Sequence, residues 1–505
     1  MKTMHTPSYV PNWLAPLANL SEIQFCMVAA LFVVSFAVVA GISWNILRSQ
    51  GNKLLQIALM KLADLWGLFF STLRNNGVRI GSKWLPDSAR VRHTHIVGAT
   101  GSGKTVLLEN LIFSDIERGH GMVIIDPKGD LSFRKRVEKA CNDAGRGMDF
   151  KLLSTNPMAP PTIWNPCGLG NVSELQSKFY NSAIYAEPHY AKHCERALLR
   201  AFQELESEKP EGFSLKHLIR QLEILSDNGR DKNIEGLFLD LHNLAEGEWG
   251  PVLSGTDPSA HTRHAEHLSL WDIVCNNKIM FVSLPTEAKA VQSQRVGRLL
   301  LQELMLVSGL LKSLPDDPKR LPFSVYVDEF DAFATPSFAT FLNKGRSANL
   351  MIHMAHQTLS DLRKVDEHFT GQIMGNCNVR FVFRQDDPDD AEKWSRFFGT
   401  SKTLKRTHRT DGGSRSGEGS EREVREFRIS PDTIKELPIG TCVYSVKSEK
   451  QLAKLRIPRP QKKLKYQIFE DISEVNYQPT ERGLGFTKKE IEKPKLKLAD
   501  QILAK

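Results

Sequence analysis

The sequence lacks the cysteine spacing of a zinc site or of a disulfide framework. Its seven cysteines are scattered singly along 505 residues, without a CxxC pair: Cys26, Cys141, Cys167, Cys194, Cys275, Cys377 and Cys442. This distribution argues against a structural metal site and fits a reducing compartment for most of the chain. No internal repeat is evident either.

The sequence also lacks a strong excess of charge of one sign. The net charge is +9 and the isoelectric point is about 9.0, which is a mild imbalance for this length. It permits nucleic acid or anionic lipid as a partner but demonstrates neither. With 41% hydrophobic and 25% charged residues, the composition is that of a folded protein. The length allows two to four domains or one large elaborated domain.

One stretch, from Ile23 to Leu47, has no charged residue. As a helix it would reach roughly 37 Å, enough to cross a hydrocarbon core of about 30 Å with some tilt. A transmembrane helix is therefore predicted, with a cleaved signal peptide or a buried soluble helix as the alternatives. Basic residues follow this stretch, beginning with Arg48 and Lys53, and they predict that the rest of the chain is cytoplasmic.

A second apolar stretch spans residues 54–73 and has Lys61 and Asp64 in its middle. Either charge would cost about 2.5–3.5 kcal/mol at a bilayer centre. The stretch predicts a helix that lies in the membrane surface or packs on the soluble domain, and a second span is the alternative. Residues 1–80 are thus expected to form a membrane anchor.

The remainder alternates β-branched runs with helical patterns, which is typical of a parallel α/β sheet. The expected strands are "HTHIVG", "GMVIIDP", "FKLLS", "KIMFVSLP", "FSVYVDE", "LMIHMAH" and "VRFVFRQ". Between residues 171 and 267 the apolar spacing is helical, which predicts an all-α domain inserted between two parts of the sheet domain, 81–170 and 268–460. Residues 400–427 predict a mobile loop or a long hairpin, and 461–505 a charged tail.

The stretch "GATGSGKT" matches the phosphate-binding loop pattern and stands between an apolar strand and an amphipathic helix. The expected nucleotide-binding residues are Gly98, Ala99, Thr100, Gly101, Ser102, Gly103, Lys104 and Thr105. Glycines let backbone N–H groups close around phosphates at a helix N-terminus. Lys104 is expected to reach the β- and γ-phosphates, and the Thr105 hydroxyl to bind Mg²⁺. ATP and Mg²⁺ are the cofactors that this pattern predicts.

The acidic half of such a site is expected at the end of "FSVYVDEF". Asp328 would hold Mg²⁺, and Glu329 would orient and polarise the attacking water. Gln357 ends the strand expected beside it and could sense the γ-phosphate or hold the water. Strand-end polar residues without a catalytic role are the alternative in each case.

Arg346, in "NKGRSANL", is the candidate arginine finger supplied to a neighbouring subunit, and Arg380 and Arg384 are its competitors. Asp126 and Lys128, in "VIIDPKGD", could touch the site or simply form a turn.

Together these motifs resemble the type IV secretion coupling proteins, the conjugative DNA-transfer ATPases of the TraD/TraG kind. The resemblance rests on "HIVGATGSGKT", "VIIDPKGDLS", "WNP", "FSVYVDEFDAFA", "NKGRSANLMIHMAHQTLSDL" and "LPIGTCVYSV", in order, from about residue 81 to 460. It implies a RecA-like P-loop motor domain, a hexamer around a channel, an inner-membrane anchor, and delivery of a relaxase–DNA complex to a secretion channel. Lys104, Thr105, Asp328, Glu329, Gln357 and Arg346 match the family's motif positions.

The sequence departs from the family pattern in two ways. The family usually has two clear transmembrane helices, and some members carry long acidic tails, whereas this chain has one clear span and a short tail. The expected function is a membrane-anchored ATPase that moves DNA toward a transfer channel. A receptor for secreted effector proteins, which uses nucleotide for assembly, is the alternative, and a tethered helicase is a third possibility.

Overall fold

A computed structural model describes residues 76–460, apart from positions 158, 186, 227–230, 254–264, 287–289, 315–319, 367 and 412–413. The predicted membrane helices at 23–47 and 54–73 and the tail at 461–505 lie outside the described residues. Of the helices that the structure describes, none is long and apolar enough to cross a membrane. The transmembrane part of the prediction therefore stays a prediction.

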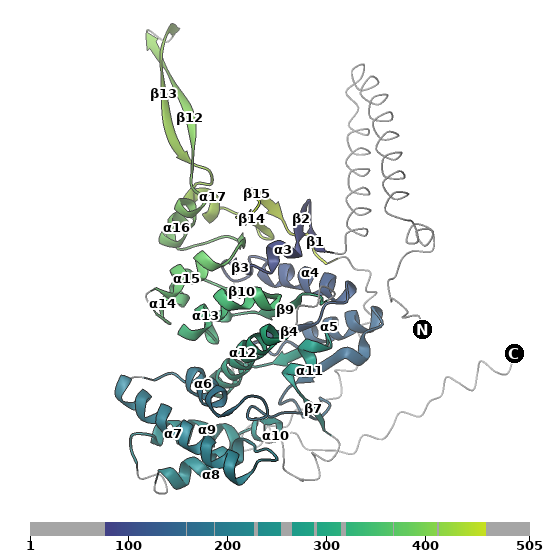
Figure 1. The fold of residues 1–505 in the computed structure, drawn as a ribbon. Coiled ribbons are helices and arrows are strands. Elements are labelled where there is room, and N and C mark those ends of the chain that lie inside the picture. Colours follow the sequence, from purple (N-terminus) through teal and green to yellow (C-terminus); the bar gives the residue numbers. More distant parts are fainter. Residues whose placement is uncertain are drawn as a thin grey trace, which may run out of the picture. The chain divides into compact units, whose positions relative to one another are not determined.

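A mixed sheet of nine strands organises residues 94–456 (Figure 1). Its order is β15 (Gln451–Arg456), β14 (Thr441–Val446), β11 (Val379–Val382), β3 (Thr94–Val97), β10 (Leu350–His356), β9 (Phe323–Val327), β4 (Met122–Asp126), β8 (Ile279–Ser283) and β5 (Phe150–Leu153). The strands from β11 to β5 pair in parallel, while β14 and β15 extend one edge antiparallel. All seven strands expected from the sequence are confirmed.

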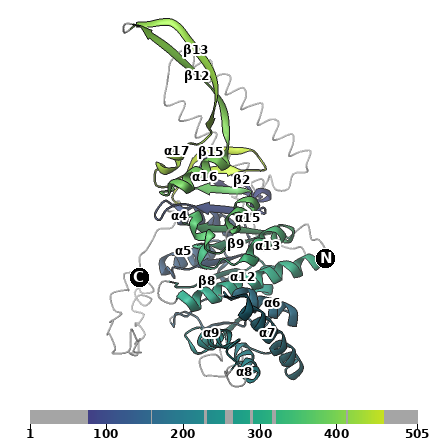
Figure 2. The same ribbon diagram turned by 90° about the vertical axis from the view of Figure 1, so that its left-hand side faces the viewer.

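Helices cover both faces of this sheet, which explains why its strands are almost continuously apolar. On one face, α4 (Lys104–Glu117) and α5 (Leu131–Asp143) share a hydrophobic cluster with residues of β3, β4 and β8. On the other, α11 (Leu270–Cys275), α12 (Ala290–Ser313), α13 (Pro336–Gly345) and α15 (Phe369–Asn376) pack in a second cluster. Figure 2 shows this layering from the side.

Helices fill most of the predicted insertion: α6 (Val172–Ser182), α7 (Pro188–Glu208), α8 (Leu215–Leu225), α9 (Glu235–Glu246) and α10 (Gly250–Leu253). Asn171 and Glu174 form a capping box that starts α6. In the described part of this segment, the only strand is at the end: β7 (Glu266–Leu268) pairs with β6 (Thr162–Trp164). A buried ion pair of 3.0 Å joins Lys178 of α6 to Glu303 of α12, so the helical segment packs directly on the sheet domain.

The sequence did not predict the hairpin of β1 (Gly77–Ile80) and β2 (Lys83–Pro86), nor the short helix α3 (Asp87–Arg90) that follows it. Residues 400–427 form a long hairpin of β12 (Thr400–Asp411) and β13 (Ser414–Phe427), the second of the two expected possibilities. Figures 1 and 2 show it extending away from α16 (Pro388–Phe398) and α17 (Pro431–Lys435). The remaining elements are α14 (Leu359–Arg363) and the 3₁₀ turns Gly147–Asp149, Phe330–Ala332 and Arg346–Ala348.

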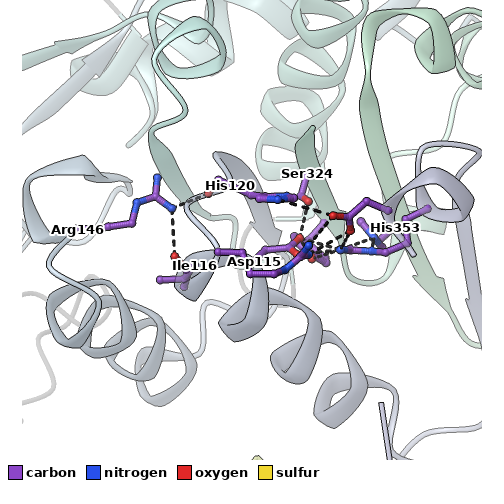
Figure 3. Close-up of polar contacts among 10 residues, drawn as sticks. Asp115, Ile116, His120, Arg146, Ser324 and His353 are labelled. Carbon is purple, nitrogen blue, oxygen red and sulfur yellow. Dashed lines mark hydrogen bonds and ion pairs between the residues drawn. The ribbon is translucent and has the colours of Figure 1, made fainter. Parts of the chain in front are cut away.

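A buried polar network holds α4 against the central strands (Figure 3). The fully buried Arg90 donates to both oxygens of Asp115 on α4, at 2.8 and 2.7 Å, and to the hydroxyl of Tyr326 on β9 at 2.8 Å. Its Nε lies 3.2 Å from Nε2 of His353 on β10. Burial alone would raise the pKa of Asp115, but the Arg90 guanidinium outweighs it and holds that pKa well below its usual range. The network therefore fixes α4 relative to β9 and β10.

Replacing Arg90 by Met should lower the free energy of unfolding by about 3–5 kcal/mol, because Asp115 would keep a buried charge without its main partner. Arg92→Met is the matched control: Arg92 is exposed and two residues away, so its loss should change stability by less than about 0.5 kcal/mol. Urea unfolding of the two variants measures the difference. Equal stabilities would mean that the network contributes nothing net.

Candidate nucleotide site

The glycine-rich loop stands between β3 and α4, at the carboxyl edge of the sheet. Gly101 and Gly103 have φ values of +73° and +117°, which side chains other than glycine rarely adopt. A Cβ atom on Gly98 would lie 2.5 Å from Cβ of Phe383, so the loop also needs a glycine to pass the neighbouring strand. The loop leads into the N-terminus of a helix of 14 residues, where backbone N–H groups and the helix dipole favour an anion.

Lys104 is the first residue of α4 and is 9% exposed. Its ammonium donates to the carbonyls of Gly98 and Ala99, at 2.6 and 3.2 Å. Burial lowers the pKa of Lys104, opposed chiefly by the Asp328 carboxylate. Two neutral carbonyl groups of the loop thus hold the ammonium of Lys104 in place. A bound phosphate could take over as its hydrogen-bond acceptor.

The expected acid pair follows β9 directly. Asp328 is 7% exposed and accepts from the backbone N–H of Glu329 at 3.0 Å. Glu329 itself has a left-handed backbone, with φ of +42°, a conformation that is uncommon and costly for a residue with a side chain. This turn separates the two carboxylates: Asp328 stays buried, and Glu329 is more accessible.

Lys128 proves to touch the acid pair. Its Nζ lies 2.9 Å from Oδ2 of Asp328 and 3.7 Å from Oε1 of Glu329. Partial burial pulls the pKa of Lys128 down, but the two carboxylates outweigh it and raise the pKa, so the amine stays charged. Asp126, in contrast, forms the turn: its two carboxylate oxygens accept from the N–H groups of Lys128 and Asp130. Burial raises the pKa of Asp126 to about 6.

Gln357 lies between the loop and the acid pair, because β10 pairs with β3 on one side and β9 on the other. Its Oε1 accepts from the hydroxyl of Thr100 at 3.0 Å. The prediction that its strand lies beside the acid strand is confirmed. A single sheet edge thus brings together Lys104, Asp328, Glu329 and Gln357.

Arg346 is not at this edge. It is exposed and begins the 3₁₀ turn before β10, whereas Gln357 follows β10 at the other end. A strand of seven residues spans roughly 20 Å, so Arg346 and Gln357 of one chain are on opposite edges of the sheet.

The two competitors differ. Arg380 is 1% exposed, donates to the carbonyls of Met374 and Asn378, and lies over the ring of Phe397, so it has a packing role. Arg384 follows β11 at the phosphate edge, where its carbonyl accepts from the N–H of Ala99 and its side chain pairs with Asp386.

These residues fit a magnesium-bound nucleotide. The Thr105 hydroxyl and the Asp328 carboxylate are oxygen ligands of the type that Mg²⁺ prefers. The hydroxyl of Ser102 is buried and has no hydrogen-bond partner among the described residues, which leaves it available to a ligand in the loop.

Comparisons with known proteins agree with this arrangement. Residues 78–141, which include the glycine-rich loop, match a family model described as the type IV secretion-system coupling protein DNA-binding domain. Residues 322–439, which include the acid pair, Arg346 and Gln357, match the TraM recognition site of TraD and TraG. The chain is 22% identical over 409 residues to the type 4 coupling protein DotL of Legionella pneumophila. In these segments the chain is similar to the type IV secretion coupling proteins.

The comparison with solved structures concerns the fold. The plasmid coupling protein TrwB in complex with ADP and Mg²⁺ has a TM-score of 0.56 at 20% identity, covering 76% of this chain and 90% of that one. VirB4 of Thermoanaerobacter pseudethanolicus has a TM-score of 0.50 at 15% identity, covering 76% and 97%. At such identities these structures establish the fold, which is the expected RecA-like one. The match to DotL covers 66% of this chain, and the chain spans only about half, 52%, of the length of DotL.

Proposed function

We propose that this chain is a type IV secretion coupling protein, a Mg²⁺-dependent ATPase that uses hydrolysis to move DNA, or a DNA–protein complex, into a type IV secretion channel. The observation that carries the proposal is the meeting of Lys104, Asp328, Glu329 and Gln357 at one sheet edge. Phosphoryl transfer requires mainly positioning and neutralisation of charge, and these four residues supply both.

Each residue has a distinct role in the proposed reaction. Lys104 neutralises the β- and γ-phosphates, and Glu329 orients and polarises the attacking water. Gln357, which accepts a hydrogen bond from Thr100 of the loop, senses whether a γ-phosphate is present. Thr105 and Asp328 would hold Mg²⁺, which neutralises phosphate charge when bound.

The proposed partners are DNA, bound without regard to sequence, the relaxase, and the proteins of the secretion channel. A homo-hexamer anchored in the bacterial inner membrane, with the motor in the cytoplasm, completes the proposal. Similarity to the coupling proteins and the apolar stretch 23–47 support the proposed hexamer and its anchor. The position of Arg346 also supports a hexamer, because this residue lies at the end of β10 opposite the nucleotide site of its own chain.

The test is ATP turnover by the full chain with and without Mg²⁺, single-stranded DNA and double-stranded DNA. Turnover that requires Mg²⁺ and rises with DNA supports a DNA motor. Turnover that is indifferent to DNA would favour the receptor for secreted proteins instead. Absence of turnover under all conditions, with intact nucleotide binding, would contradict the motor.

Lys128 leads to a prediction about Mg²⁺. Its ammonium occupies an Asp328 oxygen that the metal needs, so Lys128→Met should lower the Mg²⁺ concentration for half-maximal turnover by roughly three- to tenfold. Lys139→Met, an exposed change on α5, is the control and should leave the Mg²⁺ dependence unchanged. Lost turnover at every Mg²⁺ concentration would instead mean that Lys128 acts on the nucleotide.

A further inference from the structure

A pair of buried histidines joins β3 to β10, just before the glycine-rich loop and Gln357. His95 on β3 and His356 at the end of β10 are both fully buried. Their Nε2 atoms lie 2.6 Å apart, and two bare nitrogens this close would repel each other, so the pair shares a hydrogen. The bond therefore links the strand that leads into the loop to the strand that leads into Gln357.

The contacts of the pair decide which nitrogen carries each hydrogen. Burial lowers the pKa of His356 to about 4 and holds the pKa of His95 well below its usual range, so near neutral pH each ring has one N–H. Nδ1 of His356 lies 2.9 Å from the carbonyl oxygen of Thr358, which can only accept, so the hydrogen of His356 is on Nδ1. Nε2 of His356 then accepts from the Nε2–H of His95. Nδ1 of His95, which this assignment leaves without a hydrogen, has no hydrogen-bond partner in the described chain.

These bonds enclose the backbone of Gln357. The ring of His356, which precedes it, donates to the carbonyl of Thr358, which follows it. The carbonyl of His356 accepts from the N–H of Gly98, the first glycine of the loop, at 3.3 Å. Thr358 and Asp361 form the capping box that starts α14. The backbone is thus fixed on both sides of Gln357, whereas the Gln357 side chain is exposed.

We infer that His356, supported by His95, is a positioning residue that holds Gln357 where its amide meets a γ-phosphate. The inference rests on the proposed function, and it gives the buried pair a part in distinguishing ATP from ADP. An exposed amide responds to the γ-phosphate reproducibly only if its backbone stays in place. A displacement of about 1 Å, caused by loss of the His356 bonds, can cost roughly a hundredfold in rate.

Binding of ADP and of a non-hydrolysable ATP analogue to the full chain, both with Mg²⁺, tests the inference. The unaltered chain should bind the analogue at least about fivefold more tightly than ADP. His356→Leu removes both ring bonds and should reduce this preference to less than about twofold, as should Gln357→Ala. His353→Leu is the matched control: it removes another fully buried histidine of β10, one that contacts Arg90, and it should keep the preference. No preference in the unaltered chain, or an unchanged preference in His356→Leu, would overturn the inference.

The double variant His356→Leu/Gln357→Ala separates positioning from a merely structural role. The kcat of His356→Leu should fall by about ten- to a hundredfold, while KM changes by less than about threefold. If His356 acts through Gln357, the double variant turns over ATP no more slowly than Gln357→Ala alone, whereas independent effects multiply. His356→Asn keeps an N–H donor near the position of Nδ1, so its kcat should exceed that of His356→Leu by at least about threefold. Multiplying effects, or no recovery in His356→Asn, would contradict the positioning role.

A second variant covers a folding defect in His356→Leu. His95→Leu/His356→Leu replaces both partners by apolar side chains and leaves no ring N–H without an acceptor, so it should fold and show the same loss of preference. Thermal unfolding confirms that each variant is folded at the temperature of the assay. Binding of the analogue without any turnover by the unaltered chain would contradict the proposed function alone, and the binding preference would then decide the inference. Binding of neither nucleotide would contradict both.

Discussion

Lys104→Ala should abolish ATP turnover, lowering it by at least about a thousandfold, while the protein stays folded. The loss is expected because Lys104 is the one buried cation at the loop in the described chain, and transition-state charge on the phosphates would lose its fixed counter-charge. The fold should survive, since the ammonium donates only to two loop carbonyls that water can satisfy. Thermal unfolding and Mg²⁺-dependent phosphate release measure the two effects.

Lys139→Ala provides the control for this experiment. Lys139 is an exposed lysine on α5, which covers the same face of the sheet as α4. It should retain full turnover. Lys104→Arg adds a second comparison: it keeps the charge but replaces a compact ammonium by a bulky planar group, and it should remain strongly impaired. Unaltered turnover in Lys104→Ala would refute the assignment of the loop as the hydrolytic site.

The sequence was most informative where function depends on neighbours along the chain. Continuous β-branched runs predicted the strands because a sheet covered on both faces needs apolar residues throughout. The spacing of "GATGSGKT" predicted the loop because its glycines and lysine must be adjacent to surround a phosphate. The acid pair was found in the same way, from its place directly after a strand.

Local sequence patterns do not predict contacts between residues that are far apart in the chain. Lys128 and Asp328 are 200 positions apart, and they meet only because β4 and β9 are neighbours in the sheet. Arg380 is a charged residue in a strand, so the sequence alone allows it as a finger, but its side chain points inward and donates to the carbonyls of Asn378 and Met374. A pocket beside the glycine-rich loop is likewise lined by Val106 and by residues after 438, and no local sequence pattern predicts that these residues lie together.

A mixture of two inactive variants, Arg346→Ala and Glu329→Gln, should recover activity that neither has alone. Arg346 is exposed at the edge of the sheet opposite Gln357, so it can serve only the site of an adjacent subunit. In a ring, a subunit with an intact Glu329 regains its finger whenever the neighbour carries an intact Arg346. Random assembly of equal amounts gives such a pair at about a quarter of the sites, so recovery to about a quarter of normal turnover is expected.

The mixture separates the two possible origins of the finger. An arginine acting within its own chain gives no recovery, since every subunit then remains defective by itself. Arg384→Ala tests the remaining candidate, because Arg384 lies at the phosphate edge of its own chain. Arg396→Ala is the control, as it removes an exposed arginine that pairs only with Glu392 on the same helix in the described structure. Full activity of Arg346→Ala, with loss in Arg384→Ala, would assign the finger to Arg384 and remove the need for a neighbouring subunit in the reaction.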